Sequence, residues 1–226
     1  MRPFAFAALL GLAACENENV MQTTVVWMDW PAEVQANDAF RTRLVVWQPC
    51  AIIRGFVPSV TAEATTVTFA PYFLVDKDPV YCLDGQGYTS DFTVNVPLDT
   101  AGTAPGLPTE RLYEMRTATP PCAVCAYLNS VPWLSFGYVT VRAEPLPPTV
   151  VRNAAGTALA ERDSVGCTRI RPSGLPPSAA MVVDNADTTA TPPPWTAFVY
   201  GYIYQPAAPV CGEATVFHLM GHYTGG

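Results

Sequence analysis

The sequence has very little positive charge. Its 226 residues contain 12 basic side chains, of which Lys77 is the one lysine, against 19 acidic side chains, and the arginines are dispersed without a cluster. A protein that binds nucleic acid needs a concentrated basic surface to displace counterions from phosphates. We therefore expect no nucleic-acid partner, and we assign the mild, scattered acidity to solubility.

Helical patterning is missing as well. No stretch shows helical periodicity over three turns, and 23 prolines and 15 glycines interrupt the chain. Proline removes a backbone donor and clashes inside a helix, whereas both residues suit turns. Because 50% of the residues are apolar and only 14% are charged, the chain can form a core and is not a disordered protein. The composition favours a folded all-β protein.

Catalytic, metal and cofactor motifs are scarce. There is no Gly-x-Ser-x-Gly sequence and no glycine-rich phosphate loop after a strand, which argues against a serine hydrolase and a phosphate-binding fold. The only histidines, His218 and His222, would share one face of a strand about 13 Å apart, at roughly 3.3 Å per residue, too far to share an ion. The spacing of Asp76, Asp78 and Asp84 fits no EF-hand loop. We predict no catalytic residue, no metal and no cofactor.

The N-terminus is the most informative stretch, MRPFAFAALLGLAACENENVMQ. Arg2 precedes an apolar run from Phe4 to Ala14, which as a helix would span about 16 Å at roughly 1.5 Å per residue. The hydrocarbon core of a bilayer is about 30 Å thick, so the run is too short to remain as a transmembrane helix. A charged start, a short apolar run and small residues at its end are typical of a cleaved export signal.

The end of this run, LAAC at residues 12–15, resembles the lipobox of bacterial lipoproteins. The resemblance implies that residues 1–14 are a signal peptide and that Cys15 is diacylated and becomes the first residue. Residues 15–22 would then form a short tether to the membrane, because two acyl chains anchor a protein stably. Since Glu16 and not an aspartate follows the cysteine, we expect a lipid-anchored protein of the cell envelope, at the outer membrane.

Seven cysteines would leave one unpaired in an oxidising compartment. Assigning Cys15 to lipid leaves six that can form disulfides, Cys50, Cys82, Cys122, Cys125, Cys167 and Cys211. We predict a bond between Cys167 and Cys211, the two cysteines of the C-terminal part. Cys50 with Cys82 and Cys122 with Cys125 are the favoured pairs among the other four.

The Cys-x-x-Cys sequence in PPCAVCAY permits two further interpretations, a redox dithiol and half of a zinc site. A redox pair is usually placed at a helix N-terminus in a βαβ setting, which this chain lacks, and zinc would need two more ligands. A structural loop is favoured. A thiol–disulfide oxidoreductase of the envelope, working through Cys122 and Cys125, remains an alternative.

Runs of β-branched and aromatic residues between turn residues predict strands throughout the chain. These runs are 23–28, 39–47, 64–75, 91–96, 110–115, 133–142, 156–162, 166–172, 179–185, 196–204 and 214–220. Alternation in the second run would turn one set of side chains towards a core, namely Phe40, Thr42, Leu44 and Val46.

Three prolines in AEPLPPTV predict a linker at residues 143–150, with a loop inside one domain as the alternative. The linker would join a β-sandwich domain at 23–142 to a smaller β-sandwich or β-barrel domain at 151–226. In the first part, TTVVWMDWPAEVQANDAF followed by RTRLVVWQPC resembles the start of bacterial immunoglobulin-like domains. The resemblance implies an immunoglobulin-like sandwich, although the Cys…Trp…Cys spacing of antibody-type domains is absent.

The alternating sequence YGYIY places Tyr200, Tyr202 and Tyr204 on one face of a strand. If exposed, such a face could bind a sugar or a protein, because tyrosine combines apolar area with a polar tip. If buried, it belongs to the core, which we favour. The favoured function is a non-enzymatic envelope lipoprotein with a binding or structural role and a protein or glycan partner; the alternatives are the oxidoreductase and a carbohydrate-binding module.

Overall fold

The computed structural model describes residues 18–36, 38–48, 51–63, 65–76, 88–97, 110–118, 133–143, 151–185 and 192–223. Within these ranges the chain forms β-strands and one short 3-10 turn, Pro177–Ala179, which confirms the predicted all-β class. No helix within these ranges has the length and apolarity that crossing a membrane requires.

The strands are β1 (Glu18–Gln22), β2 (Val25–Pro31), β3 (Glu33–Gln35), β4 (Phe40–Gln48), β5 (Ile53–Val57), β6 (Val60–Glu63), β7 (Thr66–Phe69), β8 (Tyr72–Asp76), β9 (Tyr88–Val96), β10 (Glu110–Ala118), β11 (Trp133–Arg142), β12 (Arg152–Arg162), β13 (Thr168–Pro172), β14 (Met181–Val182), β15 (Trp195–Tyr204) and β16 (Val216–Tyr223). Every predicted run overlaps a strand, whereas β1, β3, β5 and β6 lie outside the predicted runs. The predicted run 64–75 is two strands, β7 and β8, because Ala70 and Pro71 interrupt it.

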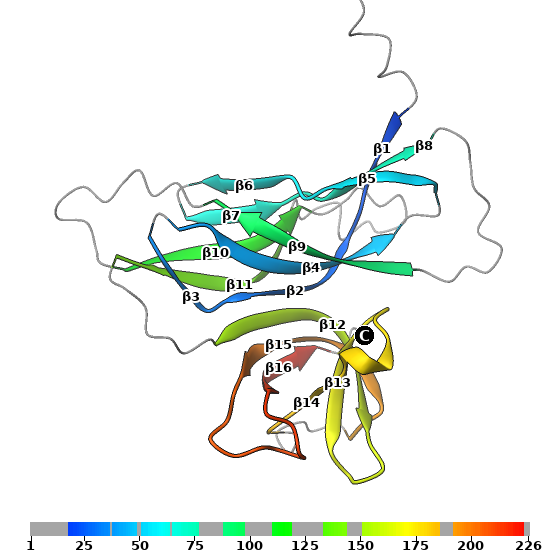
Figure 1. Ribbon diagram of the computed structural model, residues 1–226, viewed down its shortest axis with the longest axis vertical. Helices are drawn as coiled ribbons and strands as arrows, with labels where there is room; N and C mark the ends of the chain where they lie inside the picture. The colour runs from blue at the N-terminus through cyan, green and yellow to red at the C-terminus, as the bar shows by residue number, and fades with distance from the viewer. Residues whose placement is uncertain are drawn as a thin grey trace, which may run out of the picture.

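Two sheets pack over one another in the larger body of the molecule (Figure 1). One contains β12, β2, β4 and β9 in this order, and the other contains β3, β11, β10, β7 and β6; β1, β8 and β5 form a third sheet. Side chains from all three sheets form the sandwich core, among them Met28, Trp30, Leu44, Phe69, Phe73, Met115 and Val139. Burial of these side chains supplies the main driving force for the sandwich.

Strand β4 has buried side chains on both of its faces. Its predicted inward set, Phe40, Thr42, Leu44 and Val46, is buried as expected. Val45, on the opposite face, is buried as well, because it contributes to a second core on the other side of the sheet. The sheet that contains β2 and β4 therefore has apolar neighbours on both faces.

The second core lies in a curled sheet below the sandwich (Figure 1). β15 pairs with one edge of β12, while the other edge of β12 pairs with β2 over residues 152–156 and with β13 over residues 158–162. β14 pairs with β13, β16 pairs with β15, and a bridge between Val183 and Phe217 connects the two ends. The sheet thus curls into a half-barrel around Trp27, Ala158, Ala160, Ile170, Val199, Phe217 and Leu219, which we call the half-barrel core.

The two predicted domains are joined by strand pairing. Asp29 of β2 is buried and accepts a hydrogen bond from Nε of Arg152 on β12 at 2.8 Å. Arg43 of β4 lies 3.8 Å from the same carboxylate. Residues 144–150 of the predicted linker lie outside the described residues.

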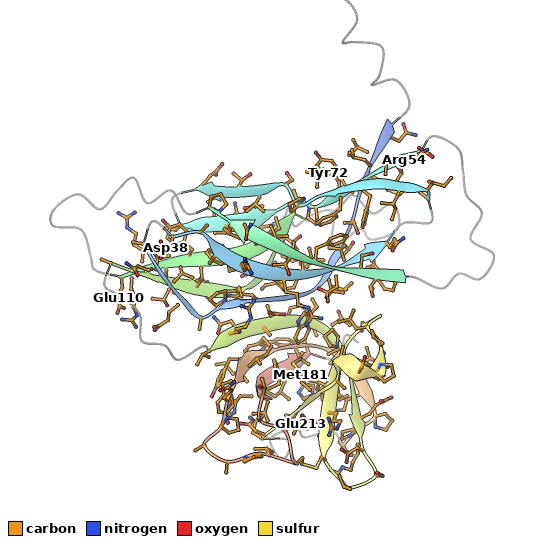
Figure 2. The ribbon with its side chains drawn as sticks, viewed as in Figure 1. Asp38, Arg54, Tyr72, Glu110, Met181 and Glu213 are labelled. Atoms are coloured by element: carbon orange, nitrogen blue, oxygen red, sulfur yellow. A yellow bond between two sulfur atoms is a disulfide. The ribbon has the colours of Figure 1, made fainter. Side chains whose placement is uncertain are left out.

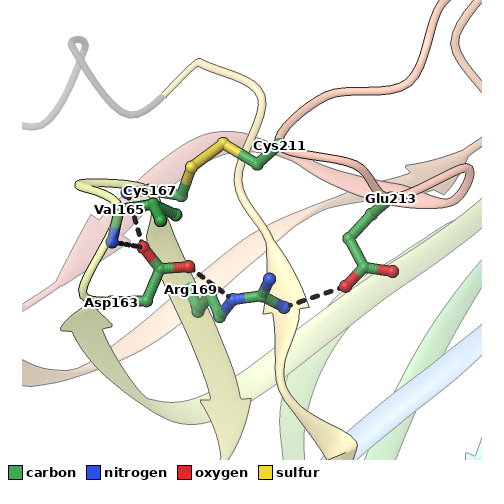
Figure 3. Close-up of a disulfide and its surroundings, with 6 residues drawn as sticks. All are labelled: Asp163, Val165, Cys167, Arg169, Cys211 and Glu213. Atoms are coloured by element: carbon green, nitrogen blue, oxygen red, sulfur yellow. Dashed lines mark hydrogen bonds and ion pairs between the residues drawn. A yellow bond between two sulfur atoms is a disulfide. The ribbon is translucent and has the colours of Figure 1, made fainter.

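The predicted disulfide between Cys167 and Cys211 is confirmed (Figure 3). It connects the turn before β13 to the loop before β16, with a Cα–Cα distance of 6.4 Å. Asp163 accepts hydrogen bonds from the backbone N–H groups of Val165 and Cys167, and its carboxylate binds Arg169. Hydrogen bonding to Arg169, and then to these backbone groups, lowers the pKa of Asp163.

The other cysteines lie outside the described residues. This applies to the predicted lipid site, Cys15, and to the predicted pairs formed by Cys50, Cys82, Cys122 and Cys125. Their acylation, pairing and redox chemistry remain predictions.

Candidate functional site: a groove at the junction

A cavity of about 420 Å³ lies where β11 passes over β12, β15 and β16. The residues that give it its chemical character are Trp30, Leu112, Tyr138, Asn153, Tyr200 and Met220. Ligand sites of proteins are typically concave, largely apolar and lined by a few polar groups, with volumes of roughly 300–1,000 Å³. We call this cavity the junction groove and treat it as the candidate functional site.

A bulge in β11 shapes one wall of the groove. The register between β10 and β11 shifts at Met115 and Arg116, so Phe136 is an extra residue of β11. Gly137 follows with φ +145°, and a Cβ atom there would lie 3.0 Å from the ring of Trp30. Trp30 in turn donates from Nε1 to the carbonyl oxygen of Tyr138 at 3.0 Å. The missing side chain at Gly137 thus leaves room for the indole beneath the groove.

A second bulge shapes the opposite wall. The register between β15 and β16 shifts between Tyr200 and Gly201, so Met220 is the extra residue of β16. The ring of Tyr200 lies over Gly221, where an added Cβ would be 2.6 Å from the ring and its hydroxyl oxygen. Tyr200 also stacks on Tyr223, with ring centroids 6.0 Å apart and an interplanar angle of 19°. Aromatic rings that cover a cross-strand glycine are a known device for stabilising sheets.

The rim of the groove is unusually apolar for a surface. Leu112 is 53% exposed, Tyr138 52% and Met220 62%. Single exposed apolar side chains need no explanation, but several gathered around one cavity indicate a binding surface. Glu33 is the charged residue among the described lining residues, and its Oε1 lies 2.7 Å from Nη2 of Arg142. The described lining contains no basic side chain.

The tyrosine face, defined as Tyr200, Tyr202 and Tyr204 of β15, leads away from the groove. All three side chains are half-buried. Tyr200 packs against the sandwich core, in line with the interpretation that we favoured, whereas Tyr202 and Tyr204 are neither core residues nor fully exposed. Tyr202 lies opposite Asn153 of β12 on one side and opposite His218 of β16 on the other. Tyr202 and His218 stack with ring centroids 4.7 Å apart at 23°.

His218 is held by a carboxylate. Its Nδ1 lies 3.0 Å from Oδ1 of Asp184, and Asp184 also accepts a hydrogen bond from the hydroxyl of Tyr204. Because a carboxylate only accepts hydrogen bonds, the proton of neutral His218 lies on Nδ1 and leaves Nε2 as an acceptor. The amide nitrogen of Asn185, a donor, lies 3.5 Å from that Nε2 and agrees with this tautomer. The bond to Asp184, assisted by burial, raises the pKa of Tyr204 to about 12.

The prediction that the two histidines share a face is wrong. Met220 is an extra residue in β16, so His218 pairs with Tyr202 while His222 pairs with Val199, whose side chain points to the other side of β15. His222 accordingly stacks on Trp195, with ring centroids 5.0 Å apart at 16°. His222 is therefore not part of the tyrosine face.

Within the described ranges no three His, Cys, Asp or Glu side chains gather closely enough to hold a metal ion. Asp76 binds Arg54, which is labelled in Figure 2, with Nε–Oδ1 at 2.7 Å, while Asp78 and Asp84 lie outside the described residues.

Sequence reasoning identified Tyr200 but missed Trp30, Leu112, Tyr138 and Met220. These residues come from four strands that are distant in the sequence, and no single run contains the groove. A glycine within a strand pattern signals a bulge, so Gly137 could have pointed to this wall. Comparison of the chain with protein-family models, curated proteins and solved structures found no match.

Proposed function

We propose that this protein is a lipid-anchored protein of the cell envelope that binds a ligand in the junction groove. The proposed location at the cell envelope is based on the LAAC sequence, in which Cys15 would carry the lipid. The disulfide between Cys167 and Cys211 is consistent with an oxidising compartment. The observation that carries the binding role is the groove itself, a concave site with three exposed apolar side chains on its rim.

We also propose an immunoglobulin-like architecture for the sandwich. Its support is the way the first strand of the sandwich crosses between sheets. After β2 pairs with β4 in one sheet, the chain passes Pro31 and continues as β3, which pairs in parallel with β11 in the opposite sheet. Trp30 of β2 and Val34 of β3 therefore enter the same core from the two sheets, as expected for two packed sheets around one core.

The anchor is tested by fractionating cells that express the full chain. With Cys15 in place, the protein should be processed and recovered with membranes. Cys15→Ala should give an uncut precursor or a soluble protein, because the thiol that accepts the lipid is gone. An alanine variant that matures normally and still partitions into detergent would contradict the anchor.

The groove is tested in the same cells with a photo-crosslinking amino acid at position 220. Met220 is exposed on the rim, and Val165, which is 78% exposed on the turn before β13, provides a matched position away from the groove. We expect a specific adduct from position 220, none from position 165, and loss of the adduct when Tyr200→Ala is added. Equal adducts at both positions, or none at 220, would refute the binding role.

A further inference from the structure

We infer that the ligand of the junction groove is an uncharged carbohydrate chain, and that it extends from the groove along the tyrosine face to His218. The inference rests on the proposed function and names the ligand class of the same site. Four features of the described residues support it: the stacked aromatic pairs, the fixed polar groups between them, the charge of the lining and the continuity of the surface.

Two stacked aromatic pairs follow one another across β15 and β16. Tyr200 stacks on Tyr223 beside the groove, and Tyr202 stacks on His218 one step further along the strand. Residues two apart on one strand face are separated by about 7 Å, at roughly 3.3 Å per residue. Pyranose rings have apolar C–H faces and hydroxyl edges, and a row of rigid rings with polar tips is complementary to both.

Hydrogen-bonding groups are fixed beside these rings. The Asn153 side chain donates to the carbonyl oxygen of Tyr138 at 2.8 Å, which holds the amide in place at the groove. At the far end, both ring nitrogens of His218 have partners, Nδ1 at 3.0 Å from Oδ1 of Asp184 and Nε2 at 3.5 Å from the amide nitrogen of Asn185, so the ring that stacks on Tyr202 is held in place. Because these groups are already fixed, less conformational entropy is lost when a ligand binds to them.

The charge of the site favours a neutral chain. Glu33 in the lining is paired with Arg142, and Asp184 is bound by Tyr204 and His218. A phosphorylated, sulfated or uronic-acid ligand would find no basic side chain in the described lining and would meet two carboxylates. Such a ligand would lose its hydration without a compensating cation. An uncharged chain has no such penalty.

The surface is continuous from the groove to His218. Asn153, Tyr202 and His218 lie in one row across β12, β15 and β16, and the neighbouring row contains Tyr200 and Gly221. Because Gly221 has no side chain, the ring of Tyr200 lies over β16 at that position and leaves the surface beside Tyr202 unobstructed by a side chain at 221. A ligand with repeating units can therefore contact the groove and the tyrosine face at the same time.

The test uses the full acylated chain in detergent micelles and titration calorimetry. The probes are neutral hexose and N-acetylhexosamine oligosaccharides, a uronic-acid oligosaccharide of matched length, and an apolar peptide. We expect at least one neutral oligosaccharide to bind and the uronic-acid chain not to bind. Tyr200→Ala and Tyr202→Ala should each weaken binding at least tenfold. Trp47→Ala, which removes a larger and more exposed ring from β4 outside the groove, should leave the affinity unchanged.

Two further variants separate a binding role from a structural one. Asp184→Asn removes the carboxylate that holds the His218 ring and the Tyr204 hydroxyl, so the ring that stacks on Tyr202 is less firmly positioned; we expect affinity to fall several-fold at an unchanged melting temperature. Tyr202→Phe keeps the stacking and should retain most of the affinity. Circular dichroism of every variant verifies that the fold is intact.

The outcomes distinguish this inference from the proposed function. If position 220 forms its specific adduct in cells but no neutral oligosaccharide binds, or the apolar peptide binds in its place, the groove is a binding site and the carbohydrate inference is overturned. If an oligosaccharide binds equally well to Tyr200→Ala and Tyr202→Ala, its site lies elsewhere and the inference is again wrong. If neither adduct nor binding appears, both proposals are refuted.

Discussion

Single glycines determine how closely the backbones of this protein approach one another. At Gly156 of β12 the backbone has φ +146°, and an added Cβ atom would lie 2.3 Å from the carbonyl oxygen of Val26 and 2.6 Å from Cα of Trp27. Both neighbours are backbone atoms of β2, which cannot rotate away as a side-chain end could. Gly156 therefore permits the pairing that joins the half-barrel to the sandwich.

We predict that Gly156→Ala lowers the free energy of unfolding by about 3 kcal/mol, because β12 must move away from β2 and the residue is strained at positive φ. Gly166→Ala is the matched control: its φ is +88°, but nothing lies within 4 Å of the added Cβ. It should lower the free energy by only about 1 kcal/mol. Urea denaturation of the two variants measures the difference, and equal losses would contradict the close approach.

At the level of strands, the sequence pattern predicted where several strands begin but not how they pair with one another. β4, β10, β11 and β15 begin within one residue of the predicted runs, because their alternating apolar residues report which face is buried. The bulges at Phe136 and Met220 were not predictable, since a bulge exists only relative to a partner strand. This is why the His222 face was assigned wrongly and most of the groove was missed.

The bond between Cys167 and Cys211 was predictable because only these two cysteines follow residue 150. It closes a separation of 44 residues, which should stabilise the fold by about 4 kcal/mol on the chain-entropy model. We predict that the double variant Cys167→Ala, Cys211→Ala has a free energy of unfolding about 4 kcal/mol lower than the wild type, measured by urea denaturation. Reducing agent should then shift the midpoint of the wild type more than that of the variant. Equal midpoints for the two oxidised proteins would show that the bond contributes nothing.

Across the whole molecule, the half-barrel depends on side chains that precede the predicted linker. Trp27 of β2 is fully buried in the half-barrel core, with its ring centroid 6.0 Å from that of Phe217, and Val26 and Val45 belong to the same core. The buried carboxylate of Asp29 is bound by Arg152 across the same junction. The junction groove lies at this boundary, so the pairing that joins the two parts also builds the candidate site.

We therefore predict that residues 151–226 do not fold alone. This fragment lacks β2 as an edge partner for β12, and without Trp27 its core would expose Phe217 to water. It should show no cooperative thermal transition and should bind a hydrophobic dye, whereas the full chain should unfold in one transition by tryptophan fluorescence and circular dichroism alike. In the full chain, Trp27→Ala should lower the free energy of unfolding by about 3–5 kcal/mol and keep that single transition, because one cavity weakens both parts together. A fragment with a sharp transition and an intact bond between Cys167 and Cys211 would instead establish the half-barrel as an independent domain.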